Sequence, residues 1–373
     1  MRASIQDELT GWYHRVHRDL PWRRTSDPYA IWVSEIMLQQ TQVETVKPYY
    51  LRFMETFPDV ETLAASPLEK VLHLWAGLGY YSRARNLHRG AAVVVERFEG
   101  RLPPDINLIK TIPGIGPYTA GAILSIAFGI PAPILDGNVI RVLSRIFHLT
   151  DDSTTTSARA VLWDLASLLV HPDQPSAFNQ AMMELGALVC VPGVPRCELC
   201  PLSHVCVAKS QGDAAELPTR GKEKVRPTQH VAAALITRGG RWLVCRRPEQ
   251  GLLGGLWELP LLEVMSPDDP AGVQVAIQHA LGLVVDVGER LDQVRHIFTH
   301  LDLSITPWRC TSRGGEVLLG VATPRRGVCT TYLEARWASQ AELKQLPTGV
   351  IVRKLLAASS APQLSLFSPS HEG

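Results

Sequence analysis

Four of the seven cysteines lie within residues 190–206 and could together hold a metal centre. They are separated by six, two and five residues, in the pattern C-x6-C-x2-C-x5-C. Structural zinc sites favour two C-x2-C pairs and this stretch has one, whereas four closely spaced thiolates can also bind an iron–sulfur cluster. His204, inside the last loop, keeps a Cys/His zinc site open as an alternative. The candidate ligands are Cys190, Cys197, Cys200 and Cys206.

Glu35 is a candidate general acid because it lies in a largely apolar segment, "WVSEIMLQQTQ", at residues 32–42. Leu38, Gln39 and Gln42 follow it at helical spacing, which predicts a face that carries no charge besides Glu35. A carboxyl group among apolar neighbours has a raised pKa and can stay protonated near neutral pH. The alternative is an ordinary solvated glutamate on a helix surface.

Asp136, in "ILDGNV", is a candidate charge stabiliser. Its position before an amphipathic stretch predicts a helix N-cap, and helix amides favour the ionised carboxylate. An anion held in this way can stabilise a positively charged sugar in the transition state. Glu35 and Asp136 therefore suggest the two-carboxylate chemistry of glycosidic bond cleavage, although Asp136 could also be an N-cap without a catalytic role.

The stretch "IPGIGPYTAGAI" at residues 112–123 is a candidate phosphate-binding turn. Gly114 and Gly116 permit a tight turn with outward amides, and Pro117 suits the first turn of a helix. Such amides bind phosphate oxygens, so local donors could bind DNA. The chain needs such donors because its 37 Lys and Arg residues are balanced by 36 Asp and Glu residues.

The patterns divide the chain into a helical part and an α+β part. Residues 1–210 show helical periodicity, as in 118–129 and 138–149. Residues 211–229 are polar and predict a linker. Within 230–360, residues 230–247 predict a β-hairpin around 238–241, and Leu301, Leu303 and Ile305 alternate as in a strand. Residues 361–373 form a Ser/Pro-rich tail.

The composition excludes a membrane or secreted protein. The N-terminus has no apolar run, and the uncharged stretch 118–135 is interrupted by Gly and Pro. An odd number of cysteines without a secretory signal is typical of a reducing compartment. We expect a cytoplasmic, nucleoid-associated monomer.

The cysteine spacing resembles the [4Fe–4S] motif of helix-hairpin-helix DNA glycosylases of the endonuclease III type. This resemblance implies that the cluster is structural and that the first loop, with Arg196, faces DNA phosphates. Residues 112–123 are similar to the hairpin of the same family, and they precede the cysteines in the same order. The resemblance thus implies an all-α glycosylase domain in which Gly114 and Gly116 contact DNA.

The segment "SEIMLQQTQ" resembles the adenine DNA glycosylases, the MutY type, which remove adenine mispaired with 8-oxoguanine or guanine in duplex DNA. The resemblance implies that Glu35 protonates the everted base and that Asp136 stabilises the sugar, with Tyr118 and Asn138 positioning it. Relatives with lyase activity have a lysine where this chain has Tyr118. Because tyrosine cannot form the Schiff base, we expect a monofunctional enzyme.

Two other functions remain open. A thymine-mismatch branch of the superfamily also has tyrosine at the position of Tyr118, but it lacks the Glu35 pattern and a C-terminal extension. A non-enzymatic DNA-binding protein stapled by a cluster needs no acid at position 35. The resemblance to the adenine enzymes also implies DNA contacts near the lesion, which it assigns to Gln40, Thr41, Leu78 and Tyr80.

The C-terminal part, from "GLLGGLWELP" to "AIQHALGL", resembles a Nudix hydrolase domain. The acidic positions of the Nudix box fall on Ala276, His279 and Ala280, which cannot bind Mg²⁺, so we expect no pyrophosphatase activity. The resemblance instead implies an 8-oxoguanine-recognition domain. Its recognition loop is predicted at Phe298, Thr299 and His300, where Thr299 replaces the family's serine.

The tail contains a short apolar string, "QLSLF", at Gln363–Phe367. It resembles the peptide by which bacterial proteins bind the sliding clamp of DNA polymerase. A peptide in an extended polar tail can reach a binding pocket on a partner. We therefore expect a possible clamp interaction besides DNA binding.

Overall fold

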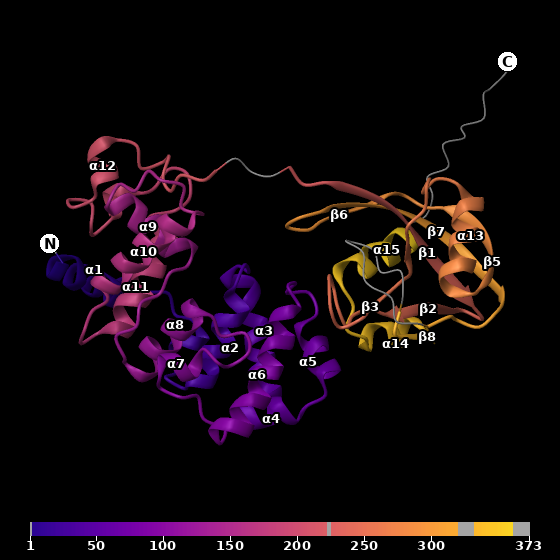
Figure 1. Ribbon diagram of the computed structural model, residues 1–373, viewed down its shortest axis with the longest axis horizontal. Helices are drawn as coiled ribbons and strands as arrows, with labels where there is room; N and C mark the ends of the chain where they lie inside the picture. Colours follow the sequence, from indigo (N-terminus) through magenta and orange to yellow (C-terminus); the bar gives the residue numbers. More distant parts are fainter. Residues whose placement is uncertain (1, 222–224, 320–331, 361–373) are drawn as a thin grey trace, which may run out of the picture. The chain divides into compact units, whose positions relative to one another are not determined.

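The computed structural model describes residues 2–221, 225–319 and 332–360, which fall into two compact units (Figure 1). The helical unit comprises Met1–Pro67 and Arg83–Lys224, and the sheet unit comprises Leu68–Ser82 and Val225–Gly373. The proposed clamp peptide, Gln363–Phe367, lies outside the described residues.

The helical unit contains the helices predicted from the periodicity of residues 1–210, drawn from indigo to pink in Figure 1. The two helices singled out in the sequence are confirmed as α8 and α9. The elements of this unit are α1 (Arg2–Val16), η1 (Pro21–Arg23), α2 (Pro28–Leu38), α3 (Val43–Thr56), α4 (Val60–Ala65), α6 (Ser82–Phe98), α7 (Ile106–Ile109), α8 (Pro117–Phe128), α9 (Gly137–Ile146), α10 (Thr156–Leu169), α11 (Pro175–Leu188), η2 (Cys197–Leu199) and α12 (Val207–Gln211).

Local sequence signals set the ends of the helices that later form the cavity. Asp27 caps α2 by accepting hydrogen bonds from the amides of Tyr29 and Ala30. Helix α8 starts with Pro117 and ends at Gly129, whose φ of +64° is the left-handed conformation that glycine adopts without strain. Both helices are buried over most of their length, so tertiary packing fixes their orientation.

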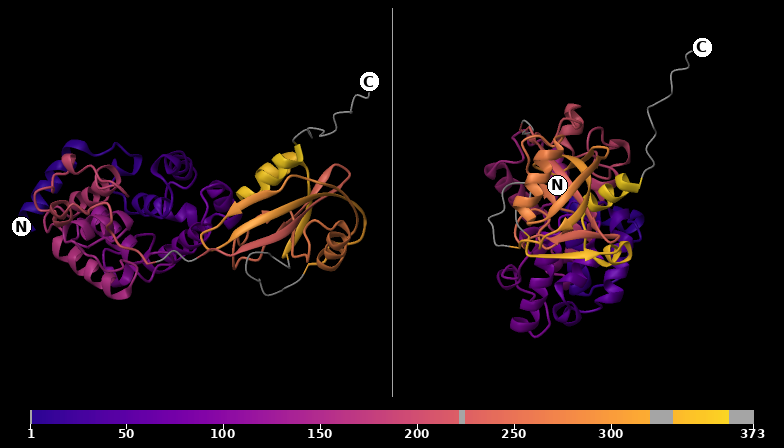
Figure 2. Two further views of the ribbon diagram at one scale, coloured as in Figure 1. Left: turned by 90° about the horizontal axis from the view of Figure 1, so that it is seen from above. Right: turned by 90° about the vertical axis from the view of Figure 1, so that its right-hand side faces the viewer.

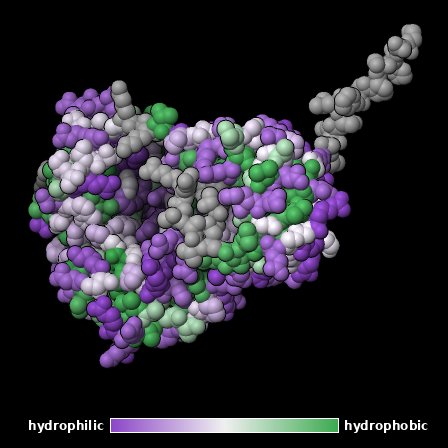
Figure 3. Space-filling view, turned by 45° about the vertical axis from the view of Figure 1, so that its right-hand side comes forward, coloured by the Kyte–Doolittle hydropathy of each residue, from purple (hydrophilic) through white to green (hydrophobic). Residues whose placement is uncertain are grey.

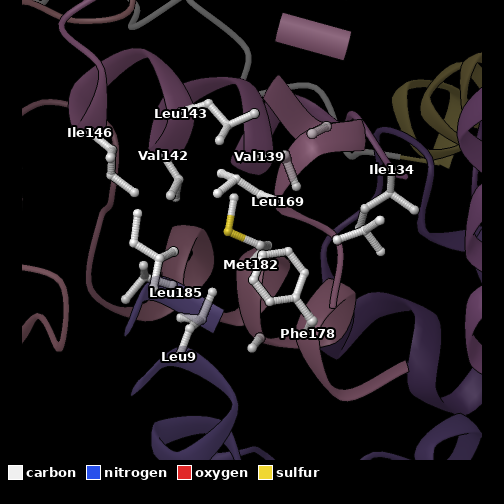
Figure 4. Close-up of a cluster of buried hydrophobic side chains, with 14 of the residues drawn as sticks. Leu9, Ile134, Val139, Val142, Leu143, Ile146, Leu169, Phe178, Met182 and Leu185 are labelled. Atoms are coloured by element: carbon white, nitrogen blue, oxygen red, sulfur yellow. The ribbon is translucent and has the colours of Figure 1, made fainter. Parts of the chain in front are cut away.

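One hydrophobic core joins α1 to α8, α9, α10 and α11. Figure 4 shows Met182 and Phe178 of α11 pointing into this core, opposite Val139 and Leu143 of α9. Close packing of this kind makes the backbone of α11 a rigid support. It therefore fixes the side chains that α11 presents on its other faces.

The sheet unit has a mixed sheet in which the central strands β1 and β7 are parallel. The order of the sheet is β3-β2-β1-β7-β5, while β4 pairs with β1, β6 with β7 and β8 with β2. The hairpin predicted around residues 238–241 is confirmed as β1 and β2. The elements are α5 (Leu68–Trp75), β1 (Thr228–Arg238), β2 (Arg241–Arg246), β3 (Trp257–Glu258), β4 (Leu261–Leu262), α13 (Pro270–Leu281), β5 (Val284–Arg290), β6 (Val294–Ile297), β7 (Asp302–Gly314), β8 (Glu334–Ala338), α14 (Gln340–Gln345) and α15 (Val350–Ser360).

Both faces of this sheet are buried. Alternate residues of β1 enter different cores, with Val231, Ala233 and Leu235 on one side and Ala232 and Ala234 on the other. Helix α15 contributes to the first core and α13 to the second. Figure 2 shows these two helices on either side of the strands. The predicted alternation of Leu301, Leu303 and Ile305 is also confirmed, since all three lie in the first core.

The assignment of residues 68–82 to the sheet unit was not predicted from the sequence. Glu69 on α5 accepts hydrogen bonds at 3.3 Å from Nε1 of Trp257 and from the guanidinium of Arg336. That guanidinium also lies over the Trp257 ring, 3.9 Å from its centroid. Tyr81 adds a hydrogen bond to the Thr348 carbonyl at 3.3 Å.

No helix within the described ranges combines the length and the apolar character that crossing a bilayer requires. On the face drawn in Figure 3, hydrophilic residues predominate and the hydrophobic residues form small groups.

Candidate active site

A cavity of about 660 Å³ in the helical unit brings both predicted carboxylates together. Its walls come from η1, α2 and the turn after it, the N-terminus of α8, the start of α9, and α11. Glu35, Tyr118, Asp136 and Asn138 all line it. The four residues predicted to be catalytic are far apart in the sequence, yet the fold places them around one space.

Glu35 is buried, with 4% of its surface exposed, although it lines the cavity. Its Oε2 accepts a hydrogen bond of 2.5 Å from the Tyr118 hydroxyl. The pKa of Glu35 is raised to about 7, mainly by burial and also by nearby Asp136, while Tyr118 and Arg23 oppose the shift. A carboxyl group with this pKa exchanges its proton near neutral pH, as a general acid must.

Asp136 has the predicted N-cap geometry. Its Oδ1 accepts from the Val139 amide at 2.7 Å, and its Oδ2 accepts from Nδ2 of Asn138 at 2.9 Å. We expected these donors to favour the ionised form. They do so, but burial outweighs them and raises the pKa of Asp136 above its ordinary value.

Tyr118 lies in the first turn of α8, between Glu35 and α11. Its hydroxyl also reaches Sδ of Met183, at 3.3 Å. Burial raises the pKa of Tyr118 well above its ordinary value, and the neighbouring carboxyls add to this effect. The phenol is therefore a neutral donor at any physiological pH.

A buried ion pair that the sequence analysis missed forms another wall of the cavity. Glu184 on α11 accepts hydrogen bonds from the Arg18 guanidinium at 2.7 Å and from Arg23 at 2.8 Å. Burial opposes its ionisation, but these bonds are stronger and lower the pKa of Glu184 to about 2. A usable signal was the single carboxylate inside the otherwise uncharged segment 177–191.

The turn after α2 departs from the predicted helical face. Leu38 and Gln39 do line the cavity with Glu35. The prediction that Gln42 shares this face is wrong, because α2 ends at Leu38 and Gln42 occupies the N-cap position of α3. Gln40 has a φ of +56°, which breaks the helical path. Gln40 and Thr41 nevertheless line the cavity.

Arg83, another residue that was not predicted, holds this turn. Its guanidinium donates to the carbonyl oxygens of Ile36, Met37 and Gln39, at 2.8, 2.7 and 2.5 Å. It also donates to the Thr41 hydroxyl at 3.2 Å. One buried cation thus satisfies the carbonyls at the end of α2 and fixes the backbone on which Gln40 and Thr41 lie.

The predicted phosphate-binding turn has the expected backbone. Gly114 has a φ of +85°, and a Cβ there would lie 2.9 Å from Cβ of Asn86. Gly116 is the N-cap of α8 and has no side chain to cover the helix amides. Both glycines are exposed at the rim of the cavity, where a phosphate can reach the amides.

The four cysteines of residues 190–206 line one small pocket of the helical unit. The Arg145 guanidinium donates to Sγ of Cys190 at 3.3 Å, and burial raises the pKa of the Cys200 thiol to about 12. Four half-buried thiols around one pocket suit a cluster whose iron would offset the thiolate charge. Among the described residues, however, no group of three or more Cys, His, Asp or Glu side chains is arranged to hold a metal ion. Arg196, between two of the cysteines, is exposed.

The remaining predicted DNA contacts lie in the sheet unit. Thr299 and His300 are exposed at the β6–β7 turn, whereas Phe298 is half-buried against the core. The Tyr80 hydroxyl lies 3.1 Å from the Thr299 hydroxyl, so two predicted contacts are adjacent. Leu78, with 6% of its surface exposed, is buried and offers little surface to a ligand.

The three Nudix-box positions lie on α13 without acidic side chains. Ala276 and Ala280 pack beside the core, and His279 is exposed. Glu258, a buried carboxylate of this unit, accepts hydrogen bonds from Arg247 at 2.9 Å and from the Tyr332 hydroxyl at 3.0 Å. This carboxylate is therefore part of the packing.

Comparisons with known proteins agree with this two-part organisation. Residues 33–167 match the HhH-GPD superfamily of base excision DNA repair proteins, and residues 231–358 match the NUDIX domain. The chain is 36% identical over 408 residues to an adenine DNA glycosylase of Rattus norvegicus, with 95% of this chain and 77% of that protein covered. It is 34% identical to the adenine DNA glycosylase of Homo sapiens, with 95% and 73% covered.

A solved structure supports the fold of the helical unit. A thermostable thymine-DNA glycosylase covers 56% of this chain and 97% of its own, with a TM-score of 0.52 and 31% sequence identity. The similarity extends over about the length of the helical unit. The predicted fold class, a helical HhH-GPD domain followed by a Nudix-like α+β domain, is confirmed.

Proposed function

We propose that this chain, which belongs to the adenine DNA glycosylase family, removes adenine mispaired with 8-oxoguanine or guanine from duplex DNA and does not efficiently cleave the strand afterwards. The family membership rests on the relatives that match it over nearly its whole length. The observation that carries the chemistry is the buried Glu35 beside Asp136 in one cavity.

Glu35 acts as the general acid. An adenine everted from the duplex enters the cavity, at a cost that is lower at a mispair than in normal DNA. Glu35, with a pKa raised to about 7 by burial, gives its proton to N7, and the base leaves as a neutral species. The resulting carboxylate then activates the attacking water.

Asp136 stabilises the positive charge that develops on the sugar. Two hydrogen bonds, from the Val139 amide and the Asn138 side chain, hold its carboxylate at the start of α9. Tyr118 occupies the first turn of α8 but has no amine. It therefore cannot form the Schiff base of a lyase, which supports a monofunctional enzyme.

DNA is held by donors on both units. The glycine amides at Gly114 and Gly116 bind phosphate, and Gln40 and Thr41 contact the duplex near the opposite base. In the sheet unit, Tyr80 and Thr299 lie together and read 8-oxoguanine with Phe298 and His300. Gln40, Thr41 and Glu35 line the same cavity, which supports a site that recognises the mispair beside the glycosidic bond that it hydrolyses.

The four cysteines would hold a [4Fe–4S] cluster that staples the loop of residues 191–196 and presents Arg196 to DNA. Arg145 would support this loop, since it donates to the carbonyl oxygens of Val191 and Gly193. The proposed domain limits are 1–210 for the glycosylase, 211–229 for the linker and 230–360 for recognition.

Single-turnover assays test this function directly. Duplexes with A opposite 8-oxoguanine, G or T, and with T opposite G, are incubated with excess protein, and release of each base is measured. We expect adenine release to be fastest opposite 8-oxoguanine and next opposite guanine. Release of thymine from the T:G duplex alone would instead favour the activity named for the structural relative.

The Glu35→Gln variant separates an enzyme from a DNA-binding protein. Loss of the acid should lower adenine release by about 10²- to 10⁴-fold while duplex binding persists. Borohydride trapping should yield no strong covalent adduct with the wild type. Unchanged release by the variant would remove Glu35 from the mechanism.

A further inference from the structure

The Tyr118 hydroxyl has two acceptors within reach but only one hydrogen. Its oxygen lies 2.5 Å from Oε2 of Glu35 and 3.3 Å from Sδ of Met183. A neutral phenol donates one hydrogen and can accept another through its oxygen. The acceptor that it serves therefore depends on whether Glu35 carries a proton.

When Glu35 is ionised, its carboxylate is the stronger acceptor and takes the Tyr118 hydrogen. When Glu35 is protonated, its O–H can donate to the Tyr118 oxygen instead. The phenol hydrogen then needs another acceptor, because a buried hydroxyl without one is costly. The Met183 thioether is a weak acceptor but is placed within reach.

Several charged groups face Glu35 from the surrounding elements. Arg23 comes from η1, and Asp136 precedes the first residue of α9. Glu184 of α11 and its partner Arg18 also line the cavity. Arg23 and Arg18 are engaged by Glu184. Among the hydrogen bonds of the described residues, the Tyr118 hydroxyl donates only to Glu35 and Met183.

We infer that Met183 is a positioning residue that stabilises the proton-loaded form of Glu35, by accepting the Tyr118 hydrogen while Tyr118 accepts from Glu35. When Glu35 gives its proton to the base, the Tyr118 hydrogen turns back to the new carboxylate. No proton leaves Tyr118 or Met183, so the step changes only hydrogen-bond partners. This inference rests on the proposed function, in which Glu35 is the acid.

The position of Met183 on α11 distinguishes it from its neighbour. Met182 points into the hydrophobic core, as Figure 4 shows, and 2% of its surface is exposed. The next residue lies about 100° further around the helix. Met183 consequently lines the cavity and meets Tyr118. The same substitution can therefore be made at Met183 in the cavity and at Met182 in the core, which provides a matched control.

The pH dependence of adenine release tests the inference in the full-length protein. Met183→Leu keeps the volume of the side chain and removes the acceptor. The protonated form of Glu35 should become less stable, so its pKa falls and the basic limb of the profile moves to lower pH. We expect a shift of about 0.3 to 0.7 pH unit, or about a two- to five-fold lower rate above the midpoint. Met183→Ile, a second variant without the acceptor, should behave alike.

Met182→Leu is the matched control, and its midpoint should equal that of the wild type. In a Tyr118→Phe background, Met183→Leu should cause no further shift, because the hydroxyl that links the residues is absent. An unmoved midpoint in both Met183 variants, or an equal loss of rate at every pH, would overturn the inference. Failure of the proposed function appears separately, as a wild type that releases no adenine or a Glu35→Gln variant that still does.

Discussion

The helical unit and the sheet unit each contain a buried glutamate, but the hydrogen-bond partners of these glutamates differ. Glu258 in the sheet unit is held by Arg247 and by the Tyr332 hydroxyl. Glu35 in the helical unit is equally buried, yet its carboxyl group accepts a hydrogen bond from a neutral phenol, that of Tyr118. Burial raises the pKa of a carboxyl such as Glu35, and a cation bound to the carboxylate opposes that rise.

Glu184 shows that the difference concerns partners and not domains. It lies in the same cavity as Glu35, but two arginines lower its pKa to about 2 against the effect of burial. The cavity thus contains one carboxyl with a pKa raised to about 7 and one with a pKa lowered to about 2. In the Nudix-like unit Glu258 is paired with Arg247, and the positions predicted to match the acidic residues of the Nudix box are Ala276, His279 and Ala280.

The largest expected effect is on stability when a paired glutamate is changed. Glu258→Gln leaves the buried Arg247 without its counter-charge, which costs about 3–5 kcal/mol. Glu184→Gln should destabilise the protein less, because its partners Arg18 and Arg23 are only partly buried. Glu35→Gln leaves no such charge behind and should cost far less. Denaturant unfolding at pH 7 measures all three. Comparable losses in all three variants would contradict the distinction between paired and unpaired carboxyls.

The pH dependence of stability should separate the two cavity glutamates. Since its folded pKa is raised to about 7, Glu35 contributes stability below pH 4.5 that is lost as the pH rises toward 7. The shift of about 2.5 units corresponds to about 3 kcal/mol at most. Glu184, with a lowered pKa, contributes stability above pH 4.5 that is lost as the pH falls toward 2.

Melting temperatures between pH 5 and pH 8 measure this difference. The wild type should lose stability across this range, and Glu35→Gln should lose less, because the variant has no carboxyl to ionise. At pH 8 the variant should therefore melt above the wild type although it is inactive. An equal fall in the melting temperatures of both proteins would show that Glu35 has the ordinary pKa of a glutamate.

The reading of the opposite base should depend on the sheet unit. Thr299→Ala removes the hydroxyl beside Tyr80, so the preference for A opposite 8-oxoguanine over A opposite G should fall by about five- to ten-fold. Thr299→Ser keeps the hydroxyl and should retain the preference. Substitution is a cleaner test than deletion of the unit, because α5 packs on Trp257 and Arg336 and would be exposed. Equal losses on both duplexes would contradict a recognition role.

The sequence predicted the carboxyl groups that line the cavity better than the residues that support it. Glu35 and Asp136 stood out because a carboxylate in an apolar segment and a residue before an amphipathic helix are local signals. Arg83 and Glu184 form hydrogen bonds with residues that are distant in the sequence, and no local pattern in the sequence predicts those partners. The prediction for Gln42 failed for a related reason. Helix α2 ends where Arg83 binds its last carbonyl oxygens, and the hydrophobic periodicity of the sequence does not reveal this end.

The smallest expected effect is the absence of pyrophosphatase activity in the sheet unit. Hydrolysis of 8-oxo-dGTP with Mg²⁺ should equal that without protein, because positions 276, 279 and 280 offer two methyl groups and one exposed imidazole. Phosphate release over a long incubation measures this, with an active Nudix enzyme as the positive control. Activity that depends on Mg²⁺ and survives in Glu35→Gln would mean that other carboxylates, such as Glu258, had been freed from their arginines. The contrast between the two units would then be wrong, since a glutamate paired with arginine would have proved able to bind Mg²⁺.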